Sequence, residues 1–203
     1  MLIWINGAFG AGKTLVAHEL QRRLEDAHVA DPELLGFALH KLLPTSARQD
    51  FQDLPQWRSA VLATLRQADA ACDGILIVPM SIVRDDYFVE IIGGLRSSGV
   101  DVRHYALTAT PDTLRHRLRF RGAYVIGRAL GRGETWAIQQ IERCVDALAS
   151  ERYATHVATD DRAPDEVVEV IAADAKLELV RPRLSPARER LHRLEIAVRH
   201  IRL

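Results

Sequence analysis

The residues with the clearest capacity for chemistry form one run near the start of the chain, Gly7-Ala8-Phe9-Gly10-Ala11-Gly12-Lys13-Thr14. The run matches the pattern G-x-x-x-x-G-K-[ST], in which glycines let backbone N–H groups turn toward phosphate oxygens. A lysine at Lys13 reaches the β- and γ-phosphates and serves catalysis, and a hydroxyl at Thr14 can bind Mg²⁺. We therefore expect a phosphate-binding loop, or P-loop, for a nucleoside triphosphate. A glycine-rich turn without a ligand is the alternative.

Asp31 is the carboxylate best placed to act beside this loop. It ends the second predicted strand, residues 28–30, on the rim where the P-loop opens. It can accept a proton from an acceptor hydroxyl or hold a Mg²⁺-bound water. An N-cap for the helix that begins with Pro32 is the alternative, and both roles are compatible. The third strand, 74–80, ends without the acid that many P-loop enzymes place there, which draws attention to Asp31.

Arginines follow the fourth predicted strand. Arg117 and Arg121 are four residues apart on one helix, so they share a face. This position resembles that of nucleoside-monophosphate kinases, in which one arginine stacks on adenine and the next reaches phosphate. Arg143 on the following helix can act from the other side, and the glycine-rich stretch at about 120–135 is expected to form a lid. The alternative is a basic, solvated surface helix.

The acceptor is expected between the second and third strands, along residues 50–58. Aromatic faces suit a ring, and polar side chains suit hydroxyls or amides. The candidate residues here are Asp50, Phe51, Gln52, Asp53, Trp57 and Arg58. Packing and helix capping are the alternative roles, while Trp4 and Trp136 are assigned to packing. Since ligands bind at the carboxyl ends of parallel strands, Met80 is added for the acceptor, and Thr159 and Asp160 for the nucleotide.

The elements that must position these residues alternate along the chain. Strands are predicted at 2–6, 28–30, 74–80, 102–107 and 155–158, with helices between them. A strand that feeds a P-loop and then alternates with helices indicates a parallel sheet covered on both faces. We therefore predict an α/β fold of three layers, with a five-stranded parallel sheet and a lid, over residues 1–180.

Composition bounds the other possibilities. The chain has 203 residues with 27 basic and 27 acidic side chains, so nothing global indicates nucleic acid. Two cysteines, Cys72 and Cys144, provide neither a disulfide framework nor a metal-ligand set. No signal peptide or membrane-spanning run is recognisable, and we expect a cytoplasmic protein.

The tail, residues 181–203, is a basic appendage with seven arginines against two glutamates. It is predicted to form an amphipathic helix with one apolar stripe, made of Leu191, Leu194, Val198 and Ile201. Such a helix can lie peripherally on the anionic inner face of the cell membrane, pack on its own domain, or pair with a second subunit. The pattern leaves these three alternatives open.

Taken together, several motifs resemble the tunicamycin-resistance proteins. The matching runs are 3–14, Asp31-Pro32-Glu33 with Gly36-Phe37, Asp50-Phe51-Gln52 with Trp57-Arg58, 74–80, 117–121 and the helix 136–144. The resemblance covers Met1 to about Ala175. It implies a P-loop kinase-like fold, ATP, Mg²⁺, and protection against a uridine-containing nucleoside antibiotic that mimics a UDP-sugar, and it adds Phe37 to the acceptor residues.

The leading hypothesis is an ATP-dependent phosphotransferase that moves the γ-phosphoryl group to a hydroxyl of a nucleoside-type antibiotic or UDP-sugar-like acceptor. Two alternatives stay open: an ATP-binding protein that sequesters the drug unchanged, and a metabolic nucleoside or nucleotide kinase. The stretch 122–133 is longer than the family pattern and the basic tail departs from it, so the acceptor is left open.

Overall fold

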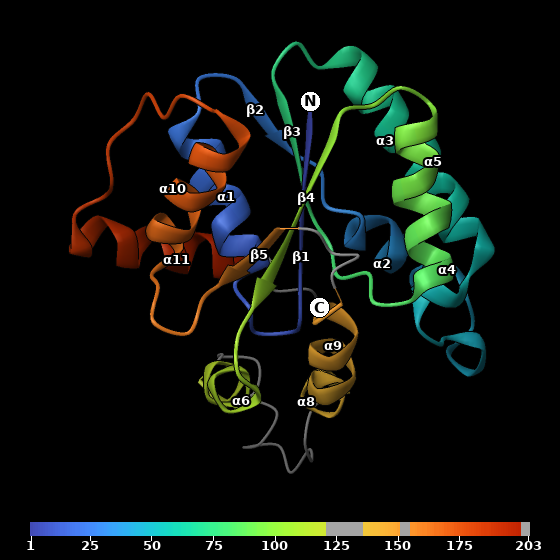
Figure 1. The fold of residues 1–203 in the computed structure, drawn as a ribbon. Coiled ribbons are helices and arrows are strands. Elements are labelled where there is room, and N and C mark those ends of the chain that lie inside the picture. Colours follow the sequence, from blue (N-terminus) through green and yellow to red (C-terminus); the bar gives the residue numbers. More distant parts are fainter. Residues whose placement is uncertain (121–135, 151–154, 200–203) are drawn as a thin grey trace.

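A parallel sheet forms the centre of the molecule. The computed structural model describes residues 1–120, 136–150 and 155–199. Its five strands, all parallel, run in the order β2-β3-β1-β4-β5 (Figure 1). Their bounds are Leu2–Gly7 for β1, Ala27–Val29 for β2, Ile75–Pro79 for β3, Val102–Thr108 for β4 and Thr155–Ala158 for β5. The predicted five-stranded α/β fold is confirmed.

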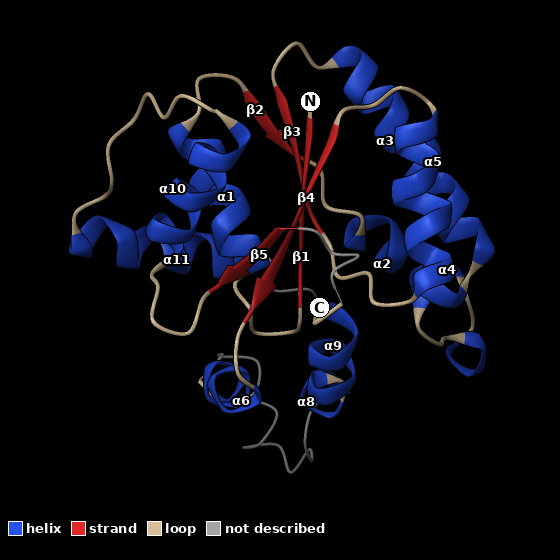
Figure 2. Cartoon of the chain, in the orientation of Figure 1, coloured by secondary structure: helices blue, strands red, loops and turns tan. Residues whose placement is uncertain are grey.

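Helices cover both faces of this sheet, as Figures 1 and 2 show. One layer holds α1 (Lys13–Arg23), α10 (Pro164–Ala175) and α11 (Pro186–Arg199). The other holds α2 (Glu33–Leu42), α3 (Pro55–Ala71), α4 (Asp85–Phe88) and α5 (Gly94–Ser97). Side chains alternate along β1, so Ile3 and Ile5 pack in one apolar core while Leu2 and Trp4 pack in the other.

Two departures from regular helices lie in the second layer. The helix between β3 and β4 is continuous, but a π-helical turn at Val89–Gly93 joins α4 to α5. Short 3₁₀ turns at Thr45–Ala47 and Phe51–Asp53 lie between α2 and α3. Such π turns often mark functional regions, and this one carries a side chain that contacts the predicted acceptor segment.

The carboxyl ends of the strands point toward a further group of helices, α6 (Pro111–Arg119), α8 (Trp136–Gln139) and α9 (Ile141–Leu148) (Figure 1). Thr110 caps α6 by accepting a hydrogen bond from the Thr113 amide, and Pro111 begins it. The predicted lid beyond residue 120, with Arg121, lies outside the described residues.

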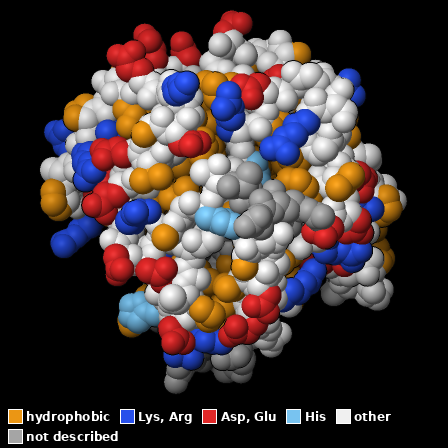
Figure 3. All heavy atoms as spheres, viewed as in Figure 1, with side chains coloured by type: hydrophobic (Ala, Val, Ile, Leu, Met, Phe, Trp, Pro, Cys, Tyr) orange, Lys and Arg blue, Asp and Glu red, His pale blue; other side chains and the backbone are white. Residues whose placement is uncertain are grey.

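The tail packs on its own domain. Arg181 donates from Nη1 to the carbonyl oxygens of Arg22 and Leu24, at 2.7 and 2.9 Å, and so caps the C-terminal end of α1. Arg183 forms ion pairs with Asp165 and Glu169 of α10. Ion pairs of this kind recur on the surface, where basic and acidic side chains are interspersed (Figure 3).

The predicted apolar stripe of the tail is not what docks α11. Leu191 and Leu194 are 67% and 61% exposed, whereas Ile196 is buried at 5%. His192 lies one turn before Ile196 and its Nε2 is 4.0 Å from Glu19 of α1. Residues four apart share a helix face, so the 192–196 face contacts α1 and the leucines are rotated away. Ile201 and the side chain of Val198 lie outside the described residues. In the parts of the chain with described structure, no helix is long and apolar enough to span a bilayer.

Candidate active site

The P-loop joins the carboxyl end of β1 to the start of α1. Gly10 and Gly12 have φ of 88° and 97°, which favours glycine, and a Cβ on Gly10 would lie 3.1 Å from the Leu114 carbonyl oxygen. Lys13 is 9% exposed and donates from Nζ to the carbonyl oxygens of Gly7 and Ala8, at 3.0 and 3.1 Å. The loop and the N-terminal end of α1 therefore combine backbone donors with one mobile cation, which fits phosphate.

Asn6 fixes the entry to this loop. Its Oδ1 accepts from the amides of Gly7 and Ile82, at 2.8 and 3.1 Å, and its Nδ2 donates to the Ile82 carbonyl oxygen at 2.8 Å. Burial lowers the pKa of His104 to about 3, so a neutral ring lies 3.3 Å from the Asn6 amide. The sequence pattern did not single out Asn6, although a polar residue in an otherwise apolar strand directly before a P-loop is the signal that would have found it.

Ser81 lies just past β3, in the region where many P-loop enzymes carry an acid. It is 5% exposed, and its Oγ donates to the Gly7 carbonyl oxygen at 2.7 Å. Its own carbonyl oxygen accepts from Gln52 Nε2 at 3.1 Å. Among the described residues no group of three His, Cys, Asp or Glu side chains could hold a metal ion. Thr14, at the start of α1, offers a hydroxyl oxygen of the kind that Mg²⁺ binds together with phosphates and water.

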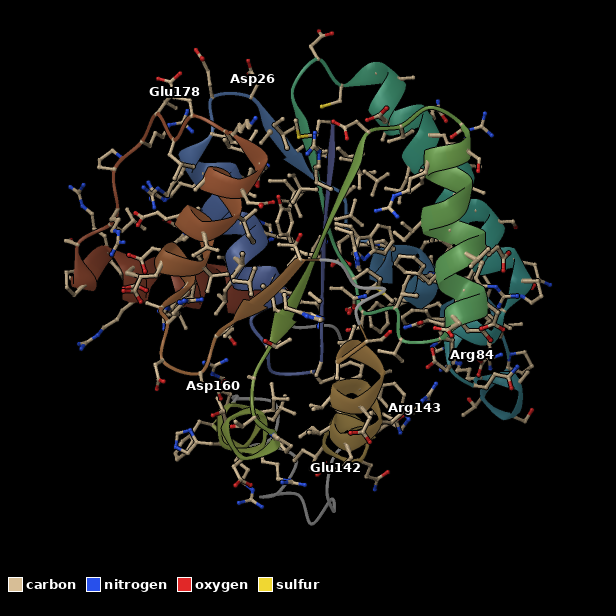
Figure 4. All side chains as sticks on the ribbon, in the orientation of Figure 1. Asp26, Arg84, Glu142, Arg143, Asp160 and Glu178 are labelled. Atoms are coloured by element: carbon tan, nitrogen blue, oxygen red, sulfur yellow. The ribbon has the colours of Figure 1, made fainter. Side chains whose placement is uncertain are left out.

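On the nucleotide side, the structure brings three predicted residues together. Arg117 of α6 donates to Thr159 Oγ1 at 3.0 Å, to the Thr159 carbonyl oxygen, and to the Asp160 carbonyl oxygen at 3.3 Å. Asp160 accepts from the Thr110 amide at 2.9 Å, and that hydrogen bond helps to hold the pKa of Asp160 below its usual value. Figure 4 shows Asp160 at the same end of the molecule as α6 and α9.

Trp136 differs from its predicted packing role. Its ring meets Phe9 of the P-loop edge-on, with centroids 5.2 Å apart, yet 51% of it is exposed. Trp4, by contrast, is fully buried, as predicted. Trp136 therefore contacts the P-loop through Phe9 while about half of its surface stays exposed.

Asp31 makes the capping contact that was the alternative to catalysis. Its Oδ1 accepts from the Glu33 amide at 3.0 Å, at the start of α2. Trp57 Nε1 donates to the Pro32 carbonyl oxygen at 3.1 Å and holds this corner of the chain. This contact occupies Oδ1, and the proposed role of Asp31 toward the acceptor stays a prediction.

Two predicted acceptor residues are core residues in the structure. Trp57 is fully buried and Met80 is 1% exposed, both in the apolar cluster under α3. Neither side chain presents a surface to a ligand. The prediction that Trp57 and Met80 contact the acceptor is therefore wrong, and both residues belong to the core beneath the acceptor segment. The reason is periodicity: Trp57, Val61 and Leu65 form the buried face of α3.

Phe51 and Asp50 are half-buried residues of the acceptor segment. A Cβ on Gly36 would lie 2.5 Å from Phe51 Cγ, so α2 can approach this ring only because residue 36 is glycine. Phe37 packs edge-on against the same ring, with centroids 5.9 Å apart. Burial raises the pKa of Asp50, whose Oδ1 accepts from the Gln52 amide at 3.0 Å.

The pKa of the Cys144 thiol, on α9, depends on charges from several parts of the site. Burial raises the pKa of the Cys144 thiol, while the charges of Lys13 and Arg143 lower it and that of Asp50 raises it. Arg143 also lowers the pKa of Asp50. Charges on the P-loop, on α9 and in the acceptor segment therefore all act on the pKa of this one buried thiol. Arg143 is labelled on α9 in Figure 4.

A cation–aromatic cluster ties the acceptor segment to α4. Tyr87 has the guanidinium carbons of Arg58 and Arg84 at 4.2 and 4.3 Å from its ring centroid, and its hydroxyl donates to Asp53 at 2.6 Å. Arg58 also donates to Glu90 of the π turn at 2.5 Å and to the Gln52 carbonyl oxygen at 2.6 Å. Arg58 and Asp53, predicted to bind the acceptor, thus hold the segment that would bind it.

Comparisons with known proteins agree with this geometry. A family model described as AAA domain matches residues 2–140. The tunicamycin resistance protein of Deinococcus radiodurans is similar, with a TM-score of 0.74 and 35% identity over 89% of this chain and 98% of that chain. None of the curated proteins compared with the chain matches it.

Two solved kinases share the fold at lower identity. APS kinase CysC of Mycobacterium tuberculosis, in complex with AMPPNP and APS, has a TM-score of 0.60 and 17% identity over 86% of this chain and 96% of that chain. Shikimate kinase of Bacteroides thetaiotaomicron has a TM-score of 0.57 and 17% identity over 87% and 99%. The predicted P-loop kinase fold is confirmed.

Proposed function

Since the chain belongs to the tunicamycin resistance protein family of AAA-domain proteins and has a P-loop kinase fold, we propose that it is an ATP-dependent phosphotransferase acting on a nucleoside antibiotic of the tunicamycin type. The observation that carries this proposal is the set of hydrogen bonds that joins the P-loop to the acceptor segment: Lys13 and Ser81 both donate to the Gly7 carbonyl oxygen, and Gln52 donates to the Ser81 carbonyl oxygen. A donor subsite and a separate polar and aromatic acceptor subsite are what transfer between two small molecules requires.

In this proposal, bound ATP with Mg²⁺ supplies the γ-phosphoryl group that the acceptor hydroxyl oxygen takes up as the bond to the ADP oxygen breaks. Lys13 turns from the carbonyls of Gly7 and Ala8 to bind the phosphates. Asp31 accepts the hydroxyl proton, and Arg143 stabilises the charge on the moving group. Thr14 holds Mg²⁺, and the loop of Thr159 and Asp160 borders the nucleotide.

The test is to incubate the full chain with ATP, Mg²⁺ and tunicamycin, beside a panel of plain nucleosides, and to weigh the products by mass spectrometry. We expect tunicamycin to become heavier by one phosphoryl group while ADP forms. Bound but chemically unaltered drug would contradict the proposal and favour sequestration. Turnover on plain nucleosides alone would identify a metabolic kinase instead.

Asp31 can be tested apart from its capping role. Asp31→Asn keeps an N-cap oxygen but removes the base, so the fold should persist while kcat falls by about 100-fold or more. Asp112→Asn, at an exposed position in the first turn of α6, is the matched control and should leave kcat unchanged. An Asp31→Asn enzyme with the kcat of the parent would show that Asp31 acts only as a cap.

We further propose that the protein works inside the cell, where ATP is available, and that α11 touches the anionic membrane surface through Leu191 and Leu194. Both leucines are exposed on a helix rich in arginine. Sedimentation with anionic liposomes should fall when both are replaced by Ser. Equal sedimentation of the parent and the double variant would contradict the contact.

A further inference from the structure

Ser81 touches both halves of the site. Its hydroxyl donates to the first glycine carbonyl of the P-loop, Gly7 O, at 2.7 Å. Its carbonyl oxygen accepts from the side chain of Gln52, in the acceptor segment, at 3.1 Å. With the bond of 3.0 Å from Lys13 to Gly7 O, these contacts form an unbroken series from the P-loop lysine to the acceptor segment.

The position of Ser81 is fixed through the next residue in the chain, Ile82, which the side chain of Asn6 binds. Asn6, fully buried, binds both the amide and the carbonyl of Ile82 with its side chain and accepts from the Gly7 amide as well. One side chain therefore sets the carboxyl ends of β1 and β3 relative to each other. Buried hydrogen bonds of this kind allow little independent movement, because breaking them leaves polar groups unsatisfied.

A bound triphosphate competes for the contacts of Gly7 O. A carbonyl oxygen has two lone pairs, and here Ser81 and Lys13 each donate to it. The ammonium group of Lys13 has three N–H donors and gives two of them to the carbonyls of Gly7 and Ala8, so a bound phosphate competes with these carbonyls for Lys13. The Ser81 hydroxyl then remains as a partner for the Gly7 carbonyl, which keeps that peptide from turning into the phosphate cradle.

We propose that Ser81 is a positioning residue that couples the P-loop to the acceptor segment: its hydroxyl holds Gly7 when Lys13 turns to the phosphates, and its carbonyl holds Gln52. This rests on the proposed use of ATP but does not depend on the acceptor. The backbone amide of Gln52 donates to Asp50 Oδ1, and its carbonyl oxygen accepts from Arg58 Nη1. A shift of Ser81 is therefore expected to move residues 50–54 together.

The test uses the full chain and the non-hydrolysable analogue AMPPNP. Its Kd is measured by calorimetry, and amide hydrogen exchange of residues 50–54 is followed with and without AMPPNP. In the parent, we expect AMPPNP to slow exchange at 50–54. Ser81→Ala should weaken AMPPNP about tenfold, the loss of one buried hydrogen bond, and abolish that slowing. Ser81→Thr, which keeps the hydroxyl, should restore both.

A second variant cuts the series at its other end. Gln52→Met removes the donor to Ser81 and should abolish the slowing at 50–54 while the Kd for AMPPNP stays within about twofold of the parent. Ser98→Ala is the matched control, since Ser98 Oγ donates to Leu95 O at 2.8 Å at the end of α5. It should change neither readout.

The outcomes separate the two proposals. Slowing at 50–54 that persists in Ser81→Ala or in Gln52→Met overturns the coupling, as does an unchanged Kd in Ser81→Ala. If Ser81→Ala does not fold, the Gln52→Met exchange decides alone. AMPPNP binding with intact coupling but no phosphoryl transfer to any acceptor would sink the proposed function and leave Ser81 in its role. Absence of AMPPNP binding in the parent overturns both.

Discussion

The nucleotide side and the acceptor side of the site are held together by different means. The P-loop is fixed by buried contacts to the backbone of neighbouring strands, through Asn6 and Ser81. The acceptor segment is fixed by contacts between side chains that are far apart in the sequence. At its surface, Tyr87 donates a hydrogen bond to Asp53 and stacks against the guanidinium of Arg58. Beneath the surface, Phe51 packs on Gly36.

The difference shows which part of the site can vary. On the donor side, the contacts depend on two buried side chains, Asn6 and Ser81, whose partners are backbone groups of the P-loop and of the residues after β3. Contacts between two side chains change with a substitution of either one, so the acceptor side can be rebuilt for another small molecule without disturbing the donor side. Changes on the two sides should therefore affect different kinetic constants.

The sharpest test of the donor side is Lys13→Met. We expect kcat/KM to fall by about 100-fold or more, because a preorganised cation beside the transferring group is lost from a buried site. Phosphoryl transfer to the acceptor found by mass spectrometry is the measurement. Lys41→Met, at the exposed end of α2, is the control. A Lys13→Met enzyme within about threefold of the parent would show that the P-loop lysine is not used.

The acceptor side can be broken with Gly36→Ala. The new methyl group would lie 2.5 Å from the Phe51 ring, so overpacking should lower the free energy of unfolding by about 1–3 kcal/mol and raise the KM for the acceptor. The Kd for AMPPNP should not change. Gly93→Ala is the control, since its Cβ would meet nothing closer than 3.7 Å. Urea titration and acceptor kinetics report the outcome, and a neutral Gly36→Ala would contradict the packing.

A finer comparison uses two tyrosines. Tyr87→Phe and Tyr105→Phe each remove a hydroxyl that donates to a carboxylate, Asp53 at 2.6 Å and Asp174 at 2.7 Å. Each should cost about 1 kcal/mol of unfolding free energy. Only Tyr87→Phe should raise the KM for the acceptor, because only Asp53 belongs to that segment. Equal KM values for the acceptor in Tyr87→Phe and Tyr105→Phe would show that the contact of Tyr87 with Asp53 does not contribute to acceptor binding.

The smallest expected effect is on the pH dependence of stability, through the ion pair between Arg183 of the tail and Glu169 of α10. Arg183 and Arg23 lower the pKa of Glu169 to about 2. A carboxylate with a lowered pKa adds stability above its ordinary pKa, and this is lost as pH falls from about 4.5 through about 2. Solvent screening keeps the effect small. Glu169→Gln should flatten this part of the pH–stability curve, whereas Glu178→Gln, at an exposed position, should not.

Much of the fold follows from local patterns. The P-loop and the order of strands and helices were predicted because periodicity and glycine spacing act over a few residues. Arg117 with Thr159 and Asp160 also fits the prediction, since strand ends meet at one edge of a parallel sheet. Their individual roles, like those of Asp31 and Arg143, stay predictions.

The remainder of the site depends on contacts that no local pattern encodes. Asn6 and Ser81 act on partners about 75 positions away in the chain, with separations of 76 and 74. Trp57 looked like a ligand contact because aromatic residues suit rings, but burial of one face of α3 decided its place. For the tail, the sequence pattern left open what the apolar stripe meets, and the structure docks the face of His192 and Ile196 on α1.

Because Arg181 caps the C-terminal end of α1, the position at which the tail is truncated matters. The helix that begins at the P-loop ends under that guanidinium, so a deletion beginning at residue 181 would loosen the nucleotide site from behind. Loss of ATP use in such a fragment would be mistaken for a regulatory effect of the tail. A deletion that begins at Ser185 spares Arg181 and Arg183, and gives the shortest chain in which the contribution of α11 itself can be judged.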